Sequence, residues 1–125
     1  MTAIERGLWG EKLALLYLND KGYSMVQRNF RSRFGEIDLI VKNKDFIVFV
    51  EVKVRKNSNF AFAREFVSYK KQKKIQATAN LWLSSRPTQL QPRFDVIEIY
   101  TGNNTGNNTD NSISKPEINH IENAF

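Results

Sequence analysis

The sequence predicts a single α/β domain in which a mixed central sheet is flanked by helices. Three observations carry this prediction: a pair of β-rich runs over residues 36–55, a capped helix before them, and a second helix followed by a strand after them. A chain of 125 residues suits one domain with one modest core.

The two β-rich runs form the centre of the predicted sheet. They span Glu36–Lys42 and Phe46–Arg55, and the turn-like Asn43-Lys44-Asp45 separates them, which is typical of a hairpin. Side chains alternate between the two faces of a strand. In the first strand, alternation groups Asp38 with Ile40 and groups Ile37 with Leu39 and Val41.

Acidic residues interrupt both strands of this hairpin. Asp38 lies in the first strand, and Glu51 and Lys53 share one face of the second. A two-residue loop at Asn43-Lys44 places Asp38 opposite Phe49 and diagonal to Glu51 on the same face. Neighbouring carboxylates of this kind suit Mg²⁺ or Mn²⁺, hard cations that take one or two protein carboxylates and leave other positions to water and phosphate.

The first helix is predicted from a capping box. In a capping box the side chain of Thr2 accepts the free backbone N–H of Glu5, and the side chain of Glu5 accepts that of Thr2. The helix is expected to run to about Lys21 and to stop at Gly22. Its expected apolar stripe comprises Ile4, Leu8, Leu15 and Leu18.

Glu11 stands at the position that completes this stripe. In one interpretation it lies at the margin of the stripe and extends to water. In the other it points over the sheet toward Asp38 and Glu51. A buried acid is costly unless something pairs with it, so the second interpretation makes Glu11 a candidate site residue.

The other predicted elements are simpler. We expect a strand over residues 23–31, a turn over 32–35, an irregular loop over 56–66, a helix over 68–83 capped by Ser68, and a strand over 93–100. Asp95 in the last strand is expected to pair with Arg93 or another basic residue and to hold the sheet edge. The domain is expected to end at residue 100. Residues 101–117 form a polar low-complexity loop, and residues 118–125 return to the domain.

The charge balance points to a polyanionic partner. The chain has 19 Lys and Arg against 13 Asp and Glu, a net charge of +6 and an isoelectric point near 9.7. Lys71 shares a helix face with Ile75, Thr78 and Trp82, so it is expected to lean toward the sheet. Solvated surface lysines are the alternative interpretation. The candidate nucleic-acid-binding residues are Lys70, Lys71, Lys74, Arg28, Arg31 and Arg33.

Composition excludes several classes of site and location. There are no cysteines, hence no disulfides or thiolate metal sites, and the single histidine, His120, argues against histidine-based metal sites. No apolar run approaches the length of a membrane span, and no signal peptide begins the chain. A cytoplasmic protein without a membrane partner is expected.

The spacing of Asp38, Glu51 and Lys53 resembles the D…ExK core of the PD-(D/E)xK nuclease superfamily. More narrowly, GEIDLI from Gly35, FVEVK from Phe49, RFDVI from Arg93 and HIENAF from His120 resemble the bacterial YraN-type family, which is related to archaeal Holliday-junction resolvases. The resemblance covers nearly the whole chain outside residues 101–117. Ile37 stands where the superfamily has its proline, a residue that carries no chemistry.

The resemblance implies a restriction-endonuclease-like core and metal-dependent hydrolysis of phosphodiesters in DNA, including branched or junction DNA. It implies that Asp38, Glu51, the Val52 carbonyl and Glu11 hold the metal and that Lys53 acts in catalysis beside the acids. Two-fold symmetric junction substrates favour a homodimer. Two alternatives stay open: a non-cleaving nucleic-acid-binding accessory protein on the same fold, and a structural salt-bridge cluster.

Overall fold

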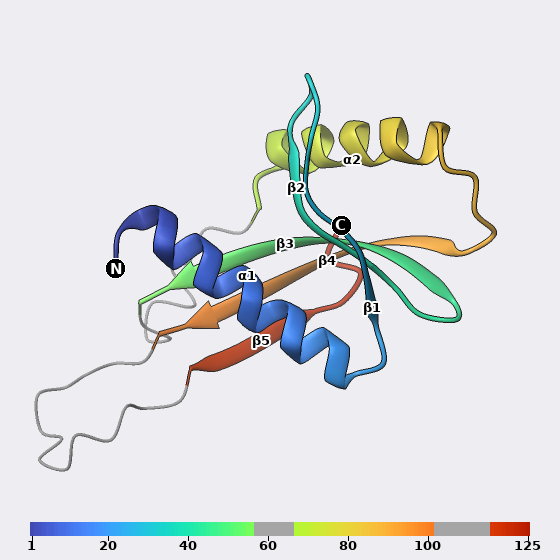
Figure 1. Cartoon of the computed structure of the whole chain (residues 1–125). Helices are drawn as coiled ribbons and strands as arrows, with labels where there is room; N and C mark the ends of the chain where they lie inside the picture. Colours follow the sequence, from blue (N-terminus) through green and yellow to red (C-terminus); the bar gives the residue numbers. More distant parts are fainter. Residues whose placement is uncertain (57–66, 102–115) are drawn as a thin grey trace, which may run out of the picture.

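The computed structural model describes residues 1–56, 67–101 and 116–125, so most of the predicted loop over 56–66 and of the low-complexity segment lies outside the described residues. Within these ranges the chain forms a mixed five-stranded sheet and two helices, an α/β fold consistent with a restriction-endonuclease-like core (Figure 1). Its elements are α1 (Ala3–Asp20), β1 (Ser24–Arg31), β2 (Glu36–Lys42), β3 (Phe46–Arg55), α2 (Tyr69–Ser84), β4 (Gln91–Tyr100) and β5 (Glu117–Ile121).

The strands lie in chain order, β1-β2-β3-β4-β5. All neighbouring pairs are antiparallel except β3 and β4, which run parallel along their full length. A parallel pair needs a crossover connection, and α2 lies in that connection. The prediction of a mixed sheet is therefore confirmed, with α1 and α2 covering its opposite faces (Figure 1).

The hairpin turn differs from the prediction by one position. Asn43 donates its backbone N–H to the Phe46 carbonyl at 3.0 Å, so Lys44 and Asp45 form the tip. The side-chain oxygen of Asn43 accepts the backbone N–H groups of Asp45 and Phe46, as an Asx turn does. This turn sets Phe49 opposite Ile40 instead of Asp38. The loop is still even, but continued pairing brings Asp38 opposite Glu51 and not diagonal to it.

β2 and β3 separate near the acids. Their ladder ends at the pair Leu39 and Val50, and beyond it the β1–β2 arm bends away from β3 toward α2 (Figure 1). On β1, Asn29 has a φ of 52°, which interrupts the regular strand at this point. Ile37 consequently packs with Phe30 in the α2 layer, so its predicted grouping with Leu39 is wrong.

The capped first helix is confirmed. Thr2 and Glu5 form the capping box in both directions, at 3.1 and 2.9 Å. α1 ends at Asp20, Lys21 caps it, and Gly22 follows with a φ of 95°, a conformation that favours glycine.

The predicted stripe of α1 is wrong in its first half. Ile4 is 78% and Leu8 53% exposed, and the buried residues of the helix are Gly10, Ala14 and Leu18. Small side chains let the helix axis approach the sheet closely, so the face that carries Gly10 and Ala14 turns inward. Large apolar side chains alone therefore gave the wrong helix face.

Gly10 is the point of closest approach between α1 and β3. A Cβ atom built on Gly10 would collide with Cγ2 of Val54. The absence of a side chain at Gly10 thus sets the position of the next residue, Glu11, over the end of β3.

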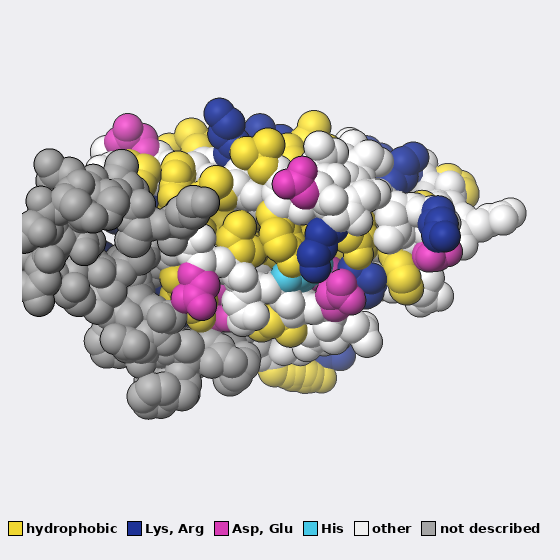
Figure 2. All heavy atoms as spheres, turned by 90° about the horizontal axis from the view of Figure 1, so that it is seen from below, with side chains coloured by type: hydrophobic (Ala, Val, Ile, Leu, Met, Phe, Trp, Pro, Cys, Tyr) yellow, Lys and Arg dark blue, Asp and Glu magenta, His cyan; other side chains and the backbone are white. Residues whose placement is uncertain are grey.

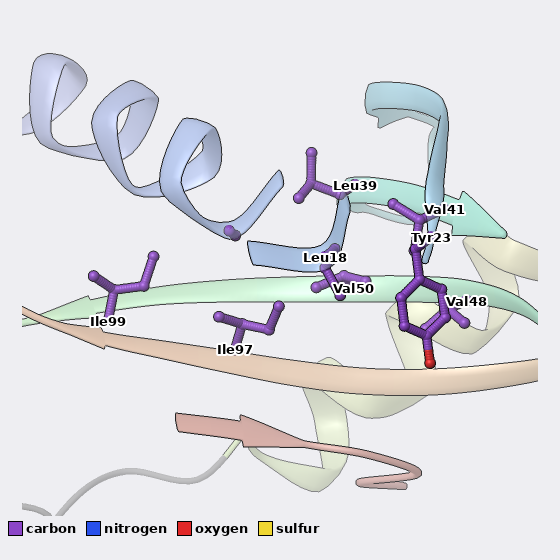
Figure 3. Close-up of a cluster of buried hydrophobic side chains, with 9 residues drawn as sticks. Leu18, Tyr23, Leu39, Val41, Val48, Val50, Ile97 and Ile99 are labelled. Carbon is purple, nitrogen blue, oxygen red and sulfur yellow. The ribbon is translucent and has the colours of Figure 1, made fainter. Parts of the chain in front are cut away.

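The sheet separates two apolar layers. Figure 3 shows the α1 layer, in which side chains from the helix, from Tyr23 and from β2, β3 and β4 point into the space between α1 and the sheet. Its buried members are Ala14, Leu18, Tyr23, Leu39, Val41, Val48, Val50, Ile97 and Ile99. Those of the α2 layer are Ile37, Ile40, Ile47, Phe49, Val67, Ile75, Ala79, Trp82 and Val96.

β4 begins at Gln91 and carries a buried charged cluster. Arg93 contacts both carboxylate oxygens of Asp95 at 2.9 and 2.8 Å, and His120 on β5 lies 2.7 Å from Asp95 Oδ2. Burial alone raises the pKa of Asp95, but hydrogen bonds from His120, Arg93 and the Asn123 backbone outweigh it, and the pKa is lowered. The predicted pairing of Asp95 with Arg93 is confirmed. Its placement at the sheet edge is wrong, because β5 covers β4.

No helix in the described part of the chain has the length and apolar character needed to cross a membrane.

Candidate active site

A polar cleft opens where β2 and β3 separate. The first turns of α1 and of α2 form its two sides, and its volume is about 360 Å³. The predicted catalytic and metal-binding residues all line it. The lining residues are Ala3, Arg6, Gly7, Glu11, Asp38, Glu51, Val52, Lys53, Val54 and Lys71.

Asp38 bridges the gap between the two strands. Its Oδ2 accepts the backbone N–H of Val52 at 2.8 Å. This side-chain bond replaces a backbone bond between β2 and β3, whose pairing ends at Leu39 and Val50. The N–H and C=O of one strand residue point to the same neighbour. The Val52 carbonyl therefore faces the same side of β3 as the Asp38 carboxylate.

Glu51 is the most perturbed acid in the cleft. Its side chain is 9% exposed, and Oε2 lies 3.3 Å from Nζ of Lys71. Burial, followed by the charge of Asp38 and a hydrogen bond with it, raises the pKa of Glu51 to about 7, although Lys71 and Lys53 oppose the shift. The two carboxyl groups are therefore held close together at an energetic cost to the ionised pair.

Glu11 reaches the cleft from α1, which covers the face of the sheet opposite to α2. Its side chain is 14% exposed, and its Oε1 is buried without a hydrogen-bond partner; Arg28 Nη2 is 3.8 Å away. Burial, followed by the charge of Asp38, raises the pKa of Glu11. The prediction that Glu11 points toward the hairpin acids is confirmed, and its orphaned oxygen is the kind of acceptor that a cation satisfies.

Two lysines balance the acids. Burial and the charge of Lys71 lower the pKa of Lys53. Burial also acts to lower the pKa of Lys71, but attraction to Glu51 and hydrogen bonds with Lys53 and Glu51 outweigh it, so that pKa is raised. The predicted lean of Lys71 toward the sheet is confirmed by its ion pair with Glu51.

The other predicted nucleic-acid-binding residues lie outside the cleft lining. Arg28 approaches Glu11, and Arg31 forms an exposed ion pair with Glu36 at 3.3 Å. Arg33 lies over the ring of Phe34. Lys70 and Lys74 are exposed on α2. Of the six, only Lys71 lines the cleft.

The excess positive charge is not uniform over the surface. The face seen in Figure 2, from below the view of Figure 1, mixes acidic, basic and hydrophobic side chains without a continuous basic patch. By contrast, the first turn of α2 contains no acidic residue to balance the exposed lysines at the start of that helix.

The donor set suits a hard cation with few protein ligands. Among residues 1–56, 67–101 and 116–125, no three Asp, Glu, His or Cys side chains are gathered closely enough to hold a metal by themselves. Asp38, Glu51 and the Val52 carbonyl nevertheless offer oxygen atoms on one side of β3, and Glu11 adds an unsatisfied oxygen. Mg²⁺ commonly keeps several waters and takes one or two carboxylates, so these residues fit it.

Arg6 is the charged residue of the cleft lining that sequence reasoning missed. The signal for it was available: Ala3, Gly7 and Glu11 follow at intervals of four, so they form one ridge of the helix. The two small side chains leave space in front of Glu11, and Arg6 borders that space.

The family model described as uncharacterised protein family UPF0102 matches residues 10–99. A UPF0102 protein of Caldanaerobacter subterraneus subsp. tengcongensis is 44% identical over 120 residues, 95% of this chain and 93% of that protein. One of Clostridioides difficile is 43% identical over 126 residues and covers both chains in full. A third, of Thermodesulfovibrio yellowstonii, is 42% identical over 125 residues, 100% of this chain and 99% of that protein. The chain therefore belongs to the UPF0102 family.

Proposed function

We propose that this protein is a metal-dependent nuclease that hydrolyses phosphodiester bonds in DNA, including branched or junction DNA. The proposal includes membership of the PD-(D/E)xK superfamily and a relation to archaeal Holliday-junction resolvases. The observation that carries it is the cleft, where two adjoining carboxyl groups and an orphaned glutamate oxygen stand beside two lysines. A bound cation would offset both the burial of these acids and their mutual repulsion.

Each cleft residue has a role in this proposal. Asp38, Glu51, the Val52 carbonyl and Glu11 hold Mg²⁺ or Mn²⁺, which when bound stabilises charge on phosphate and lowers the pKa of water. Lys53 stands beside Glu51, where its ammonium group orients the attacking water or neutralises the phosphate. Its lowered pKa makes that ammonium group a better proton donor.

Lys71 and the basic residues around the cleft supply the contacts to phosphate. A salt-bridge cluster of purely structural purpose is disfavoured, because the pKa of Glu51 is raised despite the lysine 3.3 Å away. A structural pair would hold the glutamate ionised and its pKa low.

A second candidate function is nucleic-acid binding without cleavage. Two observations favour it: among the described residues no three metal-binding side chains converge, and the ammonium group of Lys71 already contacts Glu51. An accessory protein of this kind keeps the basic surface and needs no metal.

The decisive experiment is Mg²⁺-dependent cleavage of linear, flapped and four-way DNA substrates. Glu51→Ala should abolish cleavage by the protein. Asp45→Ala, which removes an exposed acid at the far end of the hairpin, should leave it unchanged. Binding of the same substrates without cleavage under any divalent metal would favour the accessory function.

The proposal also places the protein in the cytoplasm with DNA as its partner. A homodimer would present two clefts to a two-fold symmetric substrate. Sedimentation with and without junction DNA tests this assembly directly.

A further inference from the structure

Two exposed aromatic side chains lie beside the basic first turns of α2. Phe34, at the turn between β1 and β2, is 38% exposed, and Tyr69, the first residue of α2, is 61% exposed. Single exposed hydrophobic residues are ordinary on protein surfaces. These two differ because a cation lies over each ring: Arg33 over Phe34 at 4.8 Å, and Lys73 over Tyr69 at 5.0 Å.

The turn that presents Phe34 is anchored firmly. The hydroxyl of Ser32 accepts the backbone N–H groups of Phe34 and Gly35 and lies 3.1 Å from the hydroxyl of Thr78 on α2. A Cβ built on Gly35 would lie 3.4 Å from Cβ of Lys74. The turn thus rests on α2 while the Phe34 ring stays at the surface.

The two aromatic residues flank a row of lysines. Tyr69 and Lys73 are four residues apart on α2, and so are Lys70 and Lys74, so they form two adjacent ridges. Lys74 touches the turn that holds Phe34. Tyr69 is five residues before Lys74, about 7.5 Å along the helix axis and about 140° around it, so Lys70 and Lys73 lie between the Tyr69 ring and the turn that holds Phe34.

We infer that this surface, formed by Phe34, Tyr69 and the cations Arg33, Lys70, Lys73 and Lys74, binds single-stranded nucleic acid by base stacking. Exposed rings interleaved with cations provide stacking platforms for bases and contacts for the phosphates between them. On binding, Arg33 and Lys73 turn from the rings to phosphates, and bases take their place. The inference rests on the proposed function and deepens it.

The position of the surface specifies the substrate. Lys71, which pairs with Glu51 in the cleft, adjoins Lys70 in the chain. Phe34 precedes Asp38 by four residues, about 13 Å of extended strand. A strand stacked on Phe34 and Tyr69 therefore enters the cleft after a few nucleotides, so the favoured substrate has unpaired bases close to the scissile phosphate.

Fluorescence anisotropy with labelled oligothymidylate, with EDTA present to prevent cleavage, tests the inference. Phe34→Leu and Tyr69→Leu should each weaken binding about five-fold or more, since stacking of one base on one ring is worth that much. Both should leave the salt dependence of the binding constant unchanged, because no charge is lost. Lys74→Gln should instead make the negative slope of log K against log salt less steep by about 0.7.

Three controls make the result specific. Leu81→Ala removes an exposed apolar side chain, 41% exposed on the same helix, and should not change binding. Tyr69→Phe keeps the ring and should bind as wild type does. A blunt duplex should show little difference between wild type and the leucine variants, and oligouridylate in place of oligothymidylate separates RNA from DNA as the ligand.

The outcomes separate this inference from the proposed function. Leucine variants that bind oligothymidylate as tightly as wild type, while Lys74→Gln binds more weakly, overturn the stacking surface and leave the nuclease proposal standing. Wild-type protein that binds neither single strands nor duplex overturns both. Equal losses for single strands and duplex overturn the preference for unpaired bases.

Discussion

Nζ of Lys71 on α2 lies 3.3 Å from Oε2 of Glu51 on β3, so a helix on one face of the sheet supplies the counter-charge for an acid between two strands. The pair is unequal, since burial and Asp38 keep the pKa of Glu51 raised even with Lys71 in contact. In the proposed nuclease, a metal ion that neutralises Glu51 weakens this contact and leaves Lys71 available for phosphate. Metal binding and the position of Lys71 are therefore expected to be linked.

Neutral amides in place of the hairpin acids should stabilise the metal-free protein at alkaline pH. The folded-state pKa of Glu51, about 7, is above its ordinary value of 4.5, so the folded state loses stability as pH rises from 4.5 through 7. Glu51→Gln removes this loss and Asp38→Asn reduces it, so the melting temperatures of both variants above neutral pH should equal or exceed that of wild type.

Mg²⁺ provides the matching control for these variants. It should raise the melting temperature of wild type and of Asp45→Asn, and it should not shift Glu51→Gln or Asp38→Asn. If both amide variants melt well below wild type and Mg²⁺ leaves the wild-type melt unmoved, the metal site is wrong and a structural ion pair replaces it.

Replacing Lys71 should change the titration of Glu51. Lys71 lowers the pKa of Glu51 against burial and Asp38, so Lys71→Met should move that pKa above 7. Carboxyl chemical shifts followed against pH by NMR measure the change. Lys73→Met, on the exposed face of the same helix, should leave the titration of Glu51 where it is; an equal shift would mean a general field effect and not a specific contact.

Two glycines of α1 should respond in opposite directions to alanine. Gly10→Ala forces a methyl group against Val54 and should destabilise the fold by roughly 1–3 kcal/mol. Gly7→Ala meets no atom within 4 Å and should stabilise the helix by up to about 1 kcal/mol. Urea unfolding measures both. Equal effects of the two substitutions would contradict the close approach of α1 to β3.

Acid should unfold the protein through Asp95. Its folded-state pKa is lowered below the ordinary 3.8, so its stabilisation is complete above 3.8 and is lost as pH falls through the depressed value. Urea midpoints measured from neutral to strongly acidic pH should decrease as the pH passes through this window. At neutral pH the free energy of unfolding of Asp95→Asn should be about 3–5 kcal/mol lower than that of wild type, because the substitution leaves Arg93 buried without its ion-pair partner. The stability of this variant should not show the acid step. A wild-type midpoint that stays level through this pH range would show that Asp95 is not the acid-sensitive group.

The sequence was sufficient for both helices, for β1 to β4 and for the acids and lysines of the cleft, because their signals are local. The capping box at Thr2 and Glu5, the alternation of β3 and the cap at Ser68 depend on neighbours in the chain. Glu11, Asp38 and Glu51 were recognised because each breaks an apolar pattern, whereas the role of Lys53 came from the resemblance to the D…ExK core.

The errors arose where distant contacts decide. The inward face of α1 depends on how closely β3 approaches Gly10, which the pattern of large apolar residues does not record. The layer that Ile37 joins depends on the bend of the β1–β2 arm, and β5 pairs with β4 across a segment with no apolar pattern. The turn position depended on Asn43, whose side chain binds two backbone amides and moves the tip by one residue.

That small turn controls which side chains meet at the opposite end of the hairpin. Because side chains alternate, one residue inserted or deleted at the Lys44-Asp45 tip would rotate Asp38 to the other face while preserving the sequence of both strands. In a family member with a different tip length, every acid would still match in a sequence alignment, but the acids would not lie together in the folded protein. If the proposed nuclease function holds, tip length, together with Asn43, is a criterion for sorting homologues with an assembled site from those without one, which motif matching alone would overlook.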